Sequence, residues 1–154
     1  MSAANEQPPQ KLDLFEAAVS DLLQAFDVER PPVPIELMLK RPKPGMWQEV
    51  NLSELSLSFI SVKHLYSPRM SVARLLARHI CRSEWGAQRQ LSVFATSDED
   101  IRMFARAIII PSSMLAEVSF SSRTAISLSN RFEVPEEDAN QRLIDLGLVQ
   151  GDKN

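Results

Sequence analysis

Apolar residues return every three or four positions in several separate stretches of the chain, which is the spacing of one face of a helix. The first such stretch covers residues 11–27. Pro31, Pro32 and Pro34 follow it, and a proline disfavours helix at the residue before it but suits a first helical turn. The pattern therefore predicts one helix over residues 11–27 and a short second helix over residues 34–40.

Strand-like segments occupy the middle of the chain. Residues 46–51 and 57–62 have this character, and the second segment partly alternates apolar and polar residues, as a half-buried strand does. A third short strand is expected over residues 90–95. Residues 67–85 have helical spacing, and Gly86 is a suitable stop for that helix. These segments predict a small sheet of about three strands beside a long helix.

The last third of the chain predicts three more helices. Ser97 is a good N-cap, and the acids at positions 98–100 follow it in the first turn, where the helix dipole favours negative charge. This helix is expected to stop at Pro111, and two closing helices cover residues 122–132 and 136–146. The order of helices, short strands and further helices predicts a mostly helical α+β fold that ends in a helix pair.

The composition fits one globular domain. The chain has 154 residues, 44% of them hydrophobic, and a formal net charge of −3, so nothing in the whole-chain charge points to nucleic acid. Its single cysteine, Cys81, cannot form an internal disulfide, which fits a reducing cytoplasm. Without a signal peptide or an apolar membrane span, we expect a cytoplasmic protein with one domain over residues 11–149 and tails at 1–10 and 150–154. The aromatic residues expected in its core are Phe59, Phe94, Phe104, Phe120 and Phe132.

Three arginines form a regular row within the predicted helix 67–85. Arg74, Arg78 and Arg82 are four residues apart, so they share one face of the helix. A solvated basic face is the simplest interpretation of this row. An anion or phosphate site is an alternative, because guanidinium groups bind such ligands through several donors at once.

Three blocks of sequence together resemble the ImmA/IrrE family of metallopeptidase-like proteins. Residues 69–78 read Arg-Met-Ser-Val-Ala-Arg-Leu-Leu-Ala-Arg, where the family has a basic residue, an aromatic or apolar one, Ser or Thr, an apolar residue and Ala before His-Glu-x-x-His. Residues 100–111 are similar to the family segment that holds the third zinc ligand. Residues 126–135 and 142–148 are similar to its closing helix pair. The resemblance covers roughly residues 12–149 and implies a zincin-like fold.

The chain departs from the family at the zinc-binding positions. The two motif histidines fall on Arg74 and Arg78, and the catalytic glutamate falls on Leu75. Asp100 keeps an acid at the third ligand position. Arginine has no lone pair for a metal, and leucine cannot take a proton from metal-bound water. The resemblance therefore implies an inactive pseudo-metallopeptidase, with no catalytic residues at these degenerate positions and no metal cofactor.

The resemblance also implies how the former zinc cleft is filled. We expect one or both of Arg74 and Arg78 to pair with Asp100, because the surviving acid would otherwise lie uncompensated in the cleft. Arg82 extends the same row, which is available for an ion pair or for a partner. A weaker alternative is a zinc site with displaced ligands that uses His79 and Asp100.

The expected partner is a protein. Active relatives in the resembled family cleave repressors of the helix-turn-helix class, so an inactive member is expected to regulate such a repressor, or a stress response, by protein–protein binding. Two alternatives stay open: an active metallo-endopeptidase with displaced zinc ligands, and a DNA-binding regulator with a helix-turn-helix in residues 124–148. The acids Glu136, Glu137 and Asp138 at the start of its last helix argue against direct contact with nucleic acid, because phosphate would repel them.

Overall fold

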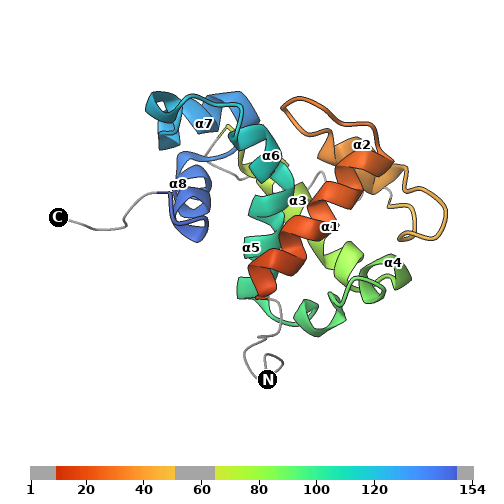
Figure 1. The fold of residues 1–154 in the computed structure, drawn as a ribbon. Helices are drawn as coiled ribbons and strands as arrows, with labels where there is room; N and C mark the ends of the chain where they lie inside the picture. Colours follow the sequence, from red (N-terminus) through yellow and green to blue (C-terminus); the bar gives the residue numbers. More distant parts are fainter. Residues whose placement is uncertain (1–9, 51–64, 149–154) are drawn as a thin grey trace, which may run out of the picture.

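The computed structural model describes residues 10–50 and 65–148, and the regular structure within them is helical (Figure 1). The longer helices are α1 (Lys11–Ala25), α3 (Ser67–Cys81), α5 (Asp98–Ile109), α7 (Ala125–Phe132) and α8 (Glu136–Asp145). Shorter helical turns join them: α2 (Ile35–Lys40), α4 (Glu84–Ala87), η4 (Ser92–Phe94), α6 (Ser112–Leu115) and η5 (Phe120–Ser122).

The predicted α+β fold with a small sheet was wrong, because the described residues contain helices and no strand. The segment expected as a strand at 90–95 contains the single turn η4. Leu91, just before this turn, is buried, and Val93 within it is 76% exposed. Over so few residues, the spacing of apolar positions does not distinguish a strand from a tight helical turn.

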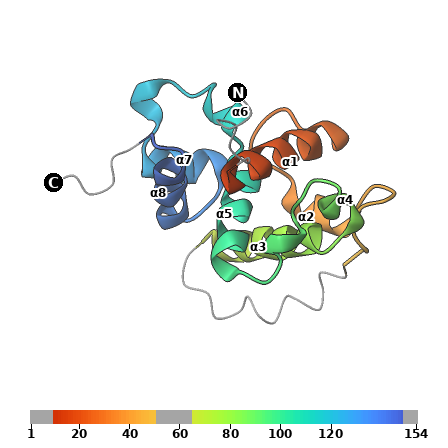
Figure 2. The same ribbon diagram turned by 60° about the horizontal axis from the view of Figure 1, so that its bottom comes forward.

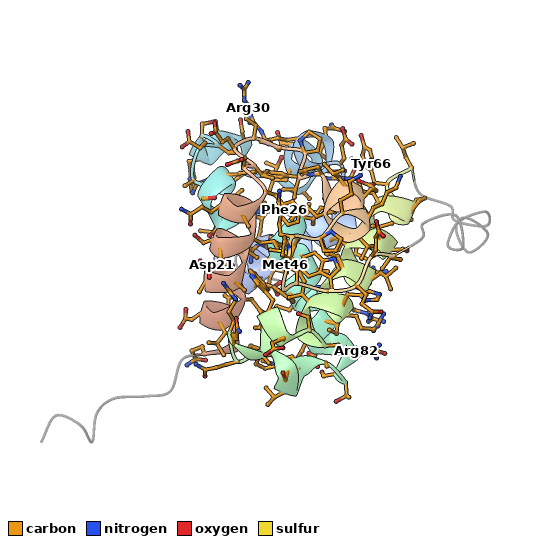
Figure 3. All side chains as sticks on the ribbon, turned by 90° about the vertical axis from the view of Figure 1, so that its right-hand side faces the viewer. Asp21, Phe26, Arg30, Met46, Tyr66 and Arg82 are labelled. Carbon is orange, nitrogen blue, oxygen red and sulfur yellow. The ribbon has the colours of Figure 1, made fainter. Side chains whose placement is uncertain are left out.

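Residues 46–50 form an irregular connection instead of the expected strand. Trp47 is buried there, and its ring lies 6.4 Å from those of both Phe26 and Trp85. Phe26 and Met46 lie on the same face of the molecule in Figure 3. The apolar positions of this segment therefore cover a helical core, with no ladder of strand hydrogen bonds. The remaining predicted strand, at 57–62, lies outside the described residues.

Helix α5 packs against three of the other long helices. It packs against α3, α1 and α8, while α2 packs on α3 and α7 packs on α8. In both ribbon views α7 and α8 lie together on one side of α5, and α2 and α4 lie on the other (Figure 1 and Figure 2). This arrangement brings α3, α5 and α8 together although they are far apart in the sequence.

An apolar core explains why these helices pack. The rings of Phe15 in α1 and Phe104 in α5 are fully buried and stack with their centroids 4.8 Å apart. On α3, Val72, Leu76 and Ile80 are buried at intervals of four residues, which is the face that the spacing predicts. Full burial of one such side chain contributes roughly 1.5–3 kcal/mol. The arginine row of α3 lies on the face that this packing leaves open.

The expected phenylalanine core is correct at Phe104 and Phe132, which are buried, while Phe94 is half-buried. The expectation for Phe120 was wrong, since this residue is 82% exposed in the turn η5. Hydrophobicity alone does not indicate which side chains of a short turn face solvent. Phe59 lies outside the described residues.

The predicted helix 67–85 is broken after residue 81. The hydroxyl of Ser83 donates to the carbonyl oxygen of Ile80 at 2.7 Å and accepts from the backbone N–H of Gly86 at 3.0 Å, so it ends one helix and caps α4. A Cβ atom at Gly86 would clash with the carbonyl oxygen of Ile80. Glycine is therefore needed for the close approach of α4 to the end of α3.

Two arginines join the C-terminal helix pair to the other helices. Arg142 of α8 is fully buried; its Nε donates to the carbonyl oxygen of Ile110 at 2.9 Å, and its Nη1 lies 2.7 Å from Oε2 of Glu16 in α1. Arg69 of α3 donates to the carbonyl oxygen of Glu133, just after α7, at 3.2 Å. Carbonyls at a helix end lack partners within the helix, so a cation there stabilises that end.

Candidate functional site

The arginine row of α3 runs along the helix face opposite its buried apolar face. The side chains of Arg74 and Arg78 are 37% and 33% exposed, and Arg82 lies at the surface just after the end of α3 (Figure 3). Leu75 is half-buried and packs against the core. The first two arginines are directed toward the beginnings of α5 and α8.

Arg74 and Arg78 each have a carboxylate partner on a neighbouring helix. Nη2 of Arg74 lies 3.9 Å from Oδ1 of Asp138 in the first turn of α8, and Nη2 of Arg78 lies 3.5 Å from Oδ1 of Asp98 at the start of α5. A separation of 3.9 Å is too long for a hydrogen bond. The Asp98 side chain is 79% exposed, so water screens its pair with Arg78, which contributes at most about 1 kcal/mol.

Asp100 is paired with α1 instead of the arginine row. Its Oδ1 accepts a hydrogen bond from Nζ of Lys11 at 2.5 Å, and this bond raises the pKa of the Lys11 ammonium. The backbone N–H of Asp100 donates to the hydroxyl of Ser97, which caps α5 as predicted. The pairing that was expected between Asp100 and the arginines is thus replaced, because Lys11 compensates the acid and the arginines have other carboxylates.

His79 and Cys81 do not belong to a group of three candidate metal ligands within the described residues. Burial lowers the pKa of His79, and the nearby charges of Arg82 and Arg78 lower it further. Cys81 is fully buried, and its burial, with a smaller effect of Asp100, raises the pKa of its thiol to about 12. Such a thiol stays protonated at neutral pH and is unreactive. Within residues 10–50 and 65–148, no three His, Cys, Asp or Glu side chains form a group that could hold a metal ion.

Two adjoining depressions lie where α8 meets α3 and α5, with volumes of about 450 Å³ and about 200 Å³. Arg74, Glu137 and Asp138 line both, so we treat them as one feature, the α8 groove. The smaller depression, the guanidinium pocket, is completed by Arg102, Arg106 and Gln141, and the larger by Ser67, Met70, Ser71, Pro135 and Glu136.

Three residues of this groove were not expected in the site from the sequence: Arg102, Arg106 and Asp138. Nε of Arg106 donates to Oδ2 of Asp145 at 2.8 Å, and the two side chains are only 11% and 4% exposed, so this ion pair joins α5 firmly to α8. The missed signal was the spacing of Asp98, Arg102 and Arg106, which repeats on α5 the four-residue row seen on α3. Two such rows on neighbouring helices indicate a polar seam between them.

No helix in the described part of the chain is long and apolar enough to cross a membrane. Comparisons with protein-family models, with curated proteins and with solved structures give no match for this chain. The likeness to the ImmA/IrrE family therefore rests on the residues of the three sequence blocks alone.

Proposed function

We propose that this chain is a catalytically inactive ImmA/IrrE-like domain that acts by binding another protein, a transcriptional repressor of the helix-turn-helix class. The inactive character follows from the residues at the zinc-binding positions. The class of the partner follows from the resemblance of the three sequence blocks, because active relatives cleave such repressors. In this proposal the domain holds the repressor and leaves its peptide bonds intact.

The observation that carries the proposal is the pairing of the arginines at the two histidine positions. Arg74 and Arg78 contact Asp138 and Asp98, so carboxylates of α8 and α5 compensate the cations on this face of α3. Hydrolysis at zinc requires lone-pair donors around the metal and a base beside it. Guanidinium groups supply no lone pair, and Leu75 supplies no base.

Two surface features support binding of a protein. The α8 groove is lined by charged side chains of both signs, from Arg74 and Arg102 and from Glu136 and Glu137. In addition, Phe120 and Ile126, just before and within α7, are 82% and 61% exposed. Aromatic side chains are enriched in protein interfaces, and burial of exposed apolar surface favours association.

The two other functions have less support from the geometry. A DNA-reading helix needs an exposed first turn that tolerates phosphate, whereas α8 begins with acids that line the α8 groove beside α3. A displaced zinc site would need His79 and Asp100, but His79 has two cationic neighbours and Asp100 is paired with Lys11.

The test is direct binding between purified proteins. Affinity capture with the full chain from its cell of origin identifies helix-turn-helix repressors, and each is then mixed with the purified chain and zinc. Calorimetry is expected to report a stable complex, and intact-mass spectrometry to find the repressor uncut. A cleaved repressor would contradict the inactive character, and failure of every captured repressor to bind directly would contradict the partner class.

Matched surface variants locate the interface. Phe120→Ser and Ile126→Ser are expected to weaken binding of the repressor. Val93→Ser is the control, because Val93 is also strongly exposed, at 76%, but lies in η4, at a distance in the sequence from α7. Equal weakening by all three substitutions would contradict an interface at the start of α7.

A further inference from the structure

We propose that the guanidinium pocket binds a phosphoryl group, either as inorganic phosphate or as a small phosphate monoester. The pocket has a volume of about 200 Å³ and lies between α3, α5 and α8. This site does not depend on the proposed binding of a repressor, since it requires only the residues that line the pocket. It is also distinct from the pair that was expected between Asp100 and the arginine row.

Unused hydrogen-bond donors are the first observation behind this site. Arg74, Arg102 and Arg106 meet in the pocket, and each guanidinium carries five N–H donors. Nε of Arg106 donates to Asp145, but Nε of Arg74 is buried without a hydrogen-bond partner. Arg102 is exposed, and it has neither a hydrogen bond nor an ion pair with another described residue. The donors of Arg102 and Nε of Arg74 are therefore not used in hydrogen bonds with other described residues.

The arrangement of charge is the second observation. Three guanidinium groups line the pocket together with two carboxylates, those of Glu137 and Asp138. The carboxylate of Asp138 is 3.9 Å from Arg74, beyond hydrogen-bond distance. Arg106 is held in place by its ion pair with Asp145. Water screens this pair little, because the two side chains are only 11% and 4% exposed. The pocket thus combines Arg106, which Asp145 holds in place, with Arg74, whose ion pair with Asp138 is long, and Arg102, which is exposed.

A phosphoryl group suits this pocket better than a carboxylate does. Its oxygens point in several directions and carry close to two negative charges at neutral pH, so it accepts hydrogen bonds from guanidinium groups that approach from two helices. A carboxylate is planar and carries a single charge, and a bidentate arginine binds it within that plane. Arginines that converge from α3 and α5 therefore indicate a tetrahedral dianion.

The geometry of the pocket also predicts that one acidic residue, Glu137, weakens the binding of a phosphoryl group. Glu137 lines the pocket and is exposed, so its carboxylate competes with a bound phosphoryl group for the guanidinium donors. Removing that charge is expected to strengthen binding, whereas removing the charge of Arg102 is expected to weaken it. A pocket whose arginines serve only to hold α8 in place would not bind phosphate and would give neither effect.

The experiment is a calorimetric titration of the full-length protein with inorganic phosphate and, separately, with glycerol 3-phosphate, at constant ionic strength maintained with chloride. Saturable binding of either ligand is expected, and tighter binding of the ester would identify a phosphate monoester as the preferred form. Arg102→Gln is expected to weaken binding about tenfold or more, as loss of a charge-assisted hydrogen bond does. Arg82→Gln is the control, because it removes the same charge from the end of α3, outside the pocket.

The acidic variants complete the test. Glu137→Gln should bind phosphate more tightly, and Glu136→Gln, whose side chain lines only the larger depression, should bind it as the native chain does. Circular dichroism checks that each variant is folded. The site would be refuted by the lack of saturable binding of both ligands, or by equal weakening in Arg82→Gln and Arg102→Gln.

Discussion

Nη1 of Arg142 lies 2.7 Å from Oε2 of Glu16, so a fully buried cation of α8 contacts a carboxylate of α1. Neither atom makes a well-aligned hydrogen bond, and the guanidinium is oriented by its Nε, which donates to the carbonyl oxygen of Ile110 at 2.9 Å. The position of α8, and therefore of the groove beside it, depends on this buried charge.

Arg142→Ala is expected to lower the free energy of unfolding by about 3 kcal/mol, because it leaves Glu16 without its cation and removes the donor to Ile110. The value is at the low end for a buried pair, since the Glu16 side chain keeps 22% exposure. Urea unfolding followed by circular dichroism measures it. Arg131→Ala, at an exposed position of α7, is the control and should change stability by less than about 0.5 kcal/mol. Equal effects of the two substitutions would refute the role of the buried pair.

Gly86→Ala separates two opposing effects. Helix propensity alone predicts that alanine in a helix is more stable than glycine by about 1 kcal/mol. The added Cβ would instead clash with the carbonyl oxygen of Ile80, so we expect a loss of about 1–3 kcal/mol, as for other overpacked sites. Thermal and urea unfolding measure the sign, and a more stable variant would contradict the close approach of α4 to α3.

Cys81 is expected to be unreactive in the folded protein. Its thiol is fully buried, with its pKa raised to about 12, and it is the single cysteine of the chain. A chromogenic disulfide reagent at neutral pH should therefore react slowly with the native protein and rapidly after addition of denaturant. Rapid reaction of the native protein would show that Cys81 is accessible. Because the chain has one cysteine, any reaction with the reagent reports on Cys81 alone.

His79 is expected to reduce stability at mildly acidic pH. Burial first, and then the charges of Arg82 and Arg78, lower its pKa in the folded state below the ordinary value of 6.5. The unfolded chain therefore binds the proton more tightly, so the free energy of unfolding should fall as the pH drops below about 6.5 and level off below the folded pKa. His79→Gln should remove this part of the pH dependence.

His64→Gln is the control for the pH experiment, because the chain has two histidines. Chemical unfolding between pH 5 and pH 8, covering roughly the range in which a histidine titrates, provides the profiles. Identical profiles for His79→Gln and the native chain would contradict a depressed pKa at His79.

The helices could be predicted from the sequence where local physics determines them. Ser97 was expected to cap a helix and does so through its hydroxyl, and the spacing of Val72, Leu76 and Ile80 identified the buried face of α3. The segment at 90–95 was misinterpreted because a short pattern of apolar and polar residues fits a strand and a helical turn equally well. Such a pattern becomes decisive only over a longer stretch.

The ion pairs of the site could be predicted only in part. The row of Arg74, Arg78 and Arg82 follows from helical spacing, but the choice of their partners depends on how far each neighbouring helix is displaced along α3. Asp100 lies one helical turn from the N-cap and faces Lys11, whereas Asp98 and Asp138 face the row. Asp98 and Asp100 are only two residues apart on α5, yet one pairs with Arg78 and the other with Lys11. The sequence contains no local signal that tells which of the two acids faces the arginine row.

Zinc titration of the purified full-length chain, after removal of metal with a chelator, tests the central claim most directly. With arginines at positions 74 and 78, leucine at position 75 and Asp100 paired with Lys11, we predict no saturable zinc binding at neutral pH by calorimetry. Saturable binding of one zinc ion per chain that is abolished by His79→Gln or Asp100→Asn would contradict the account.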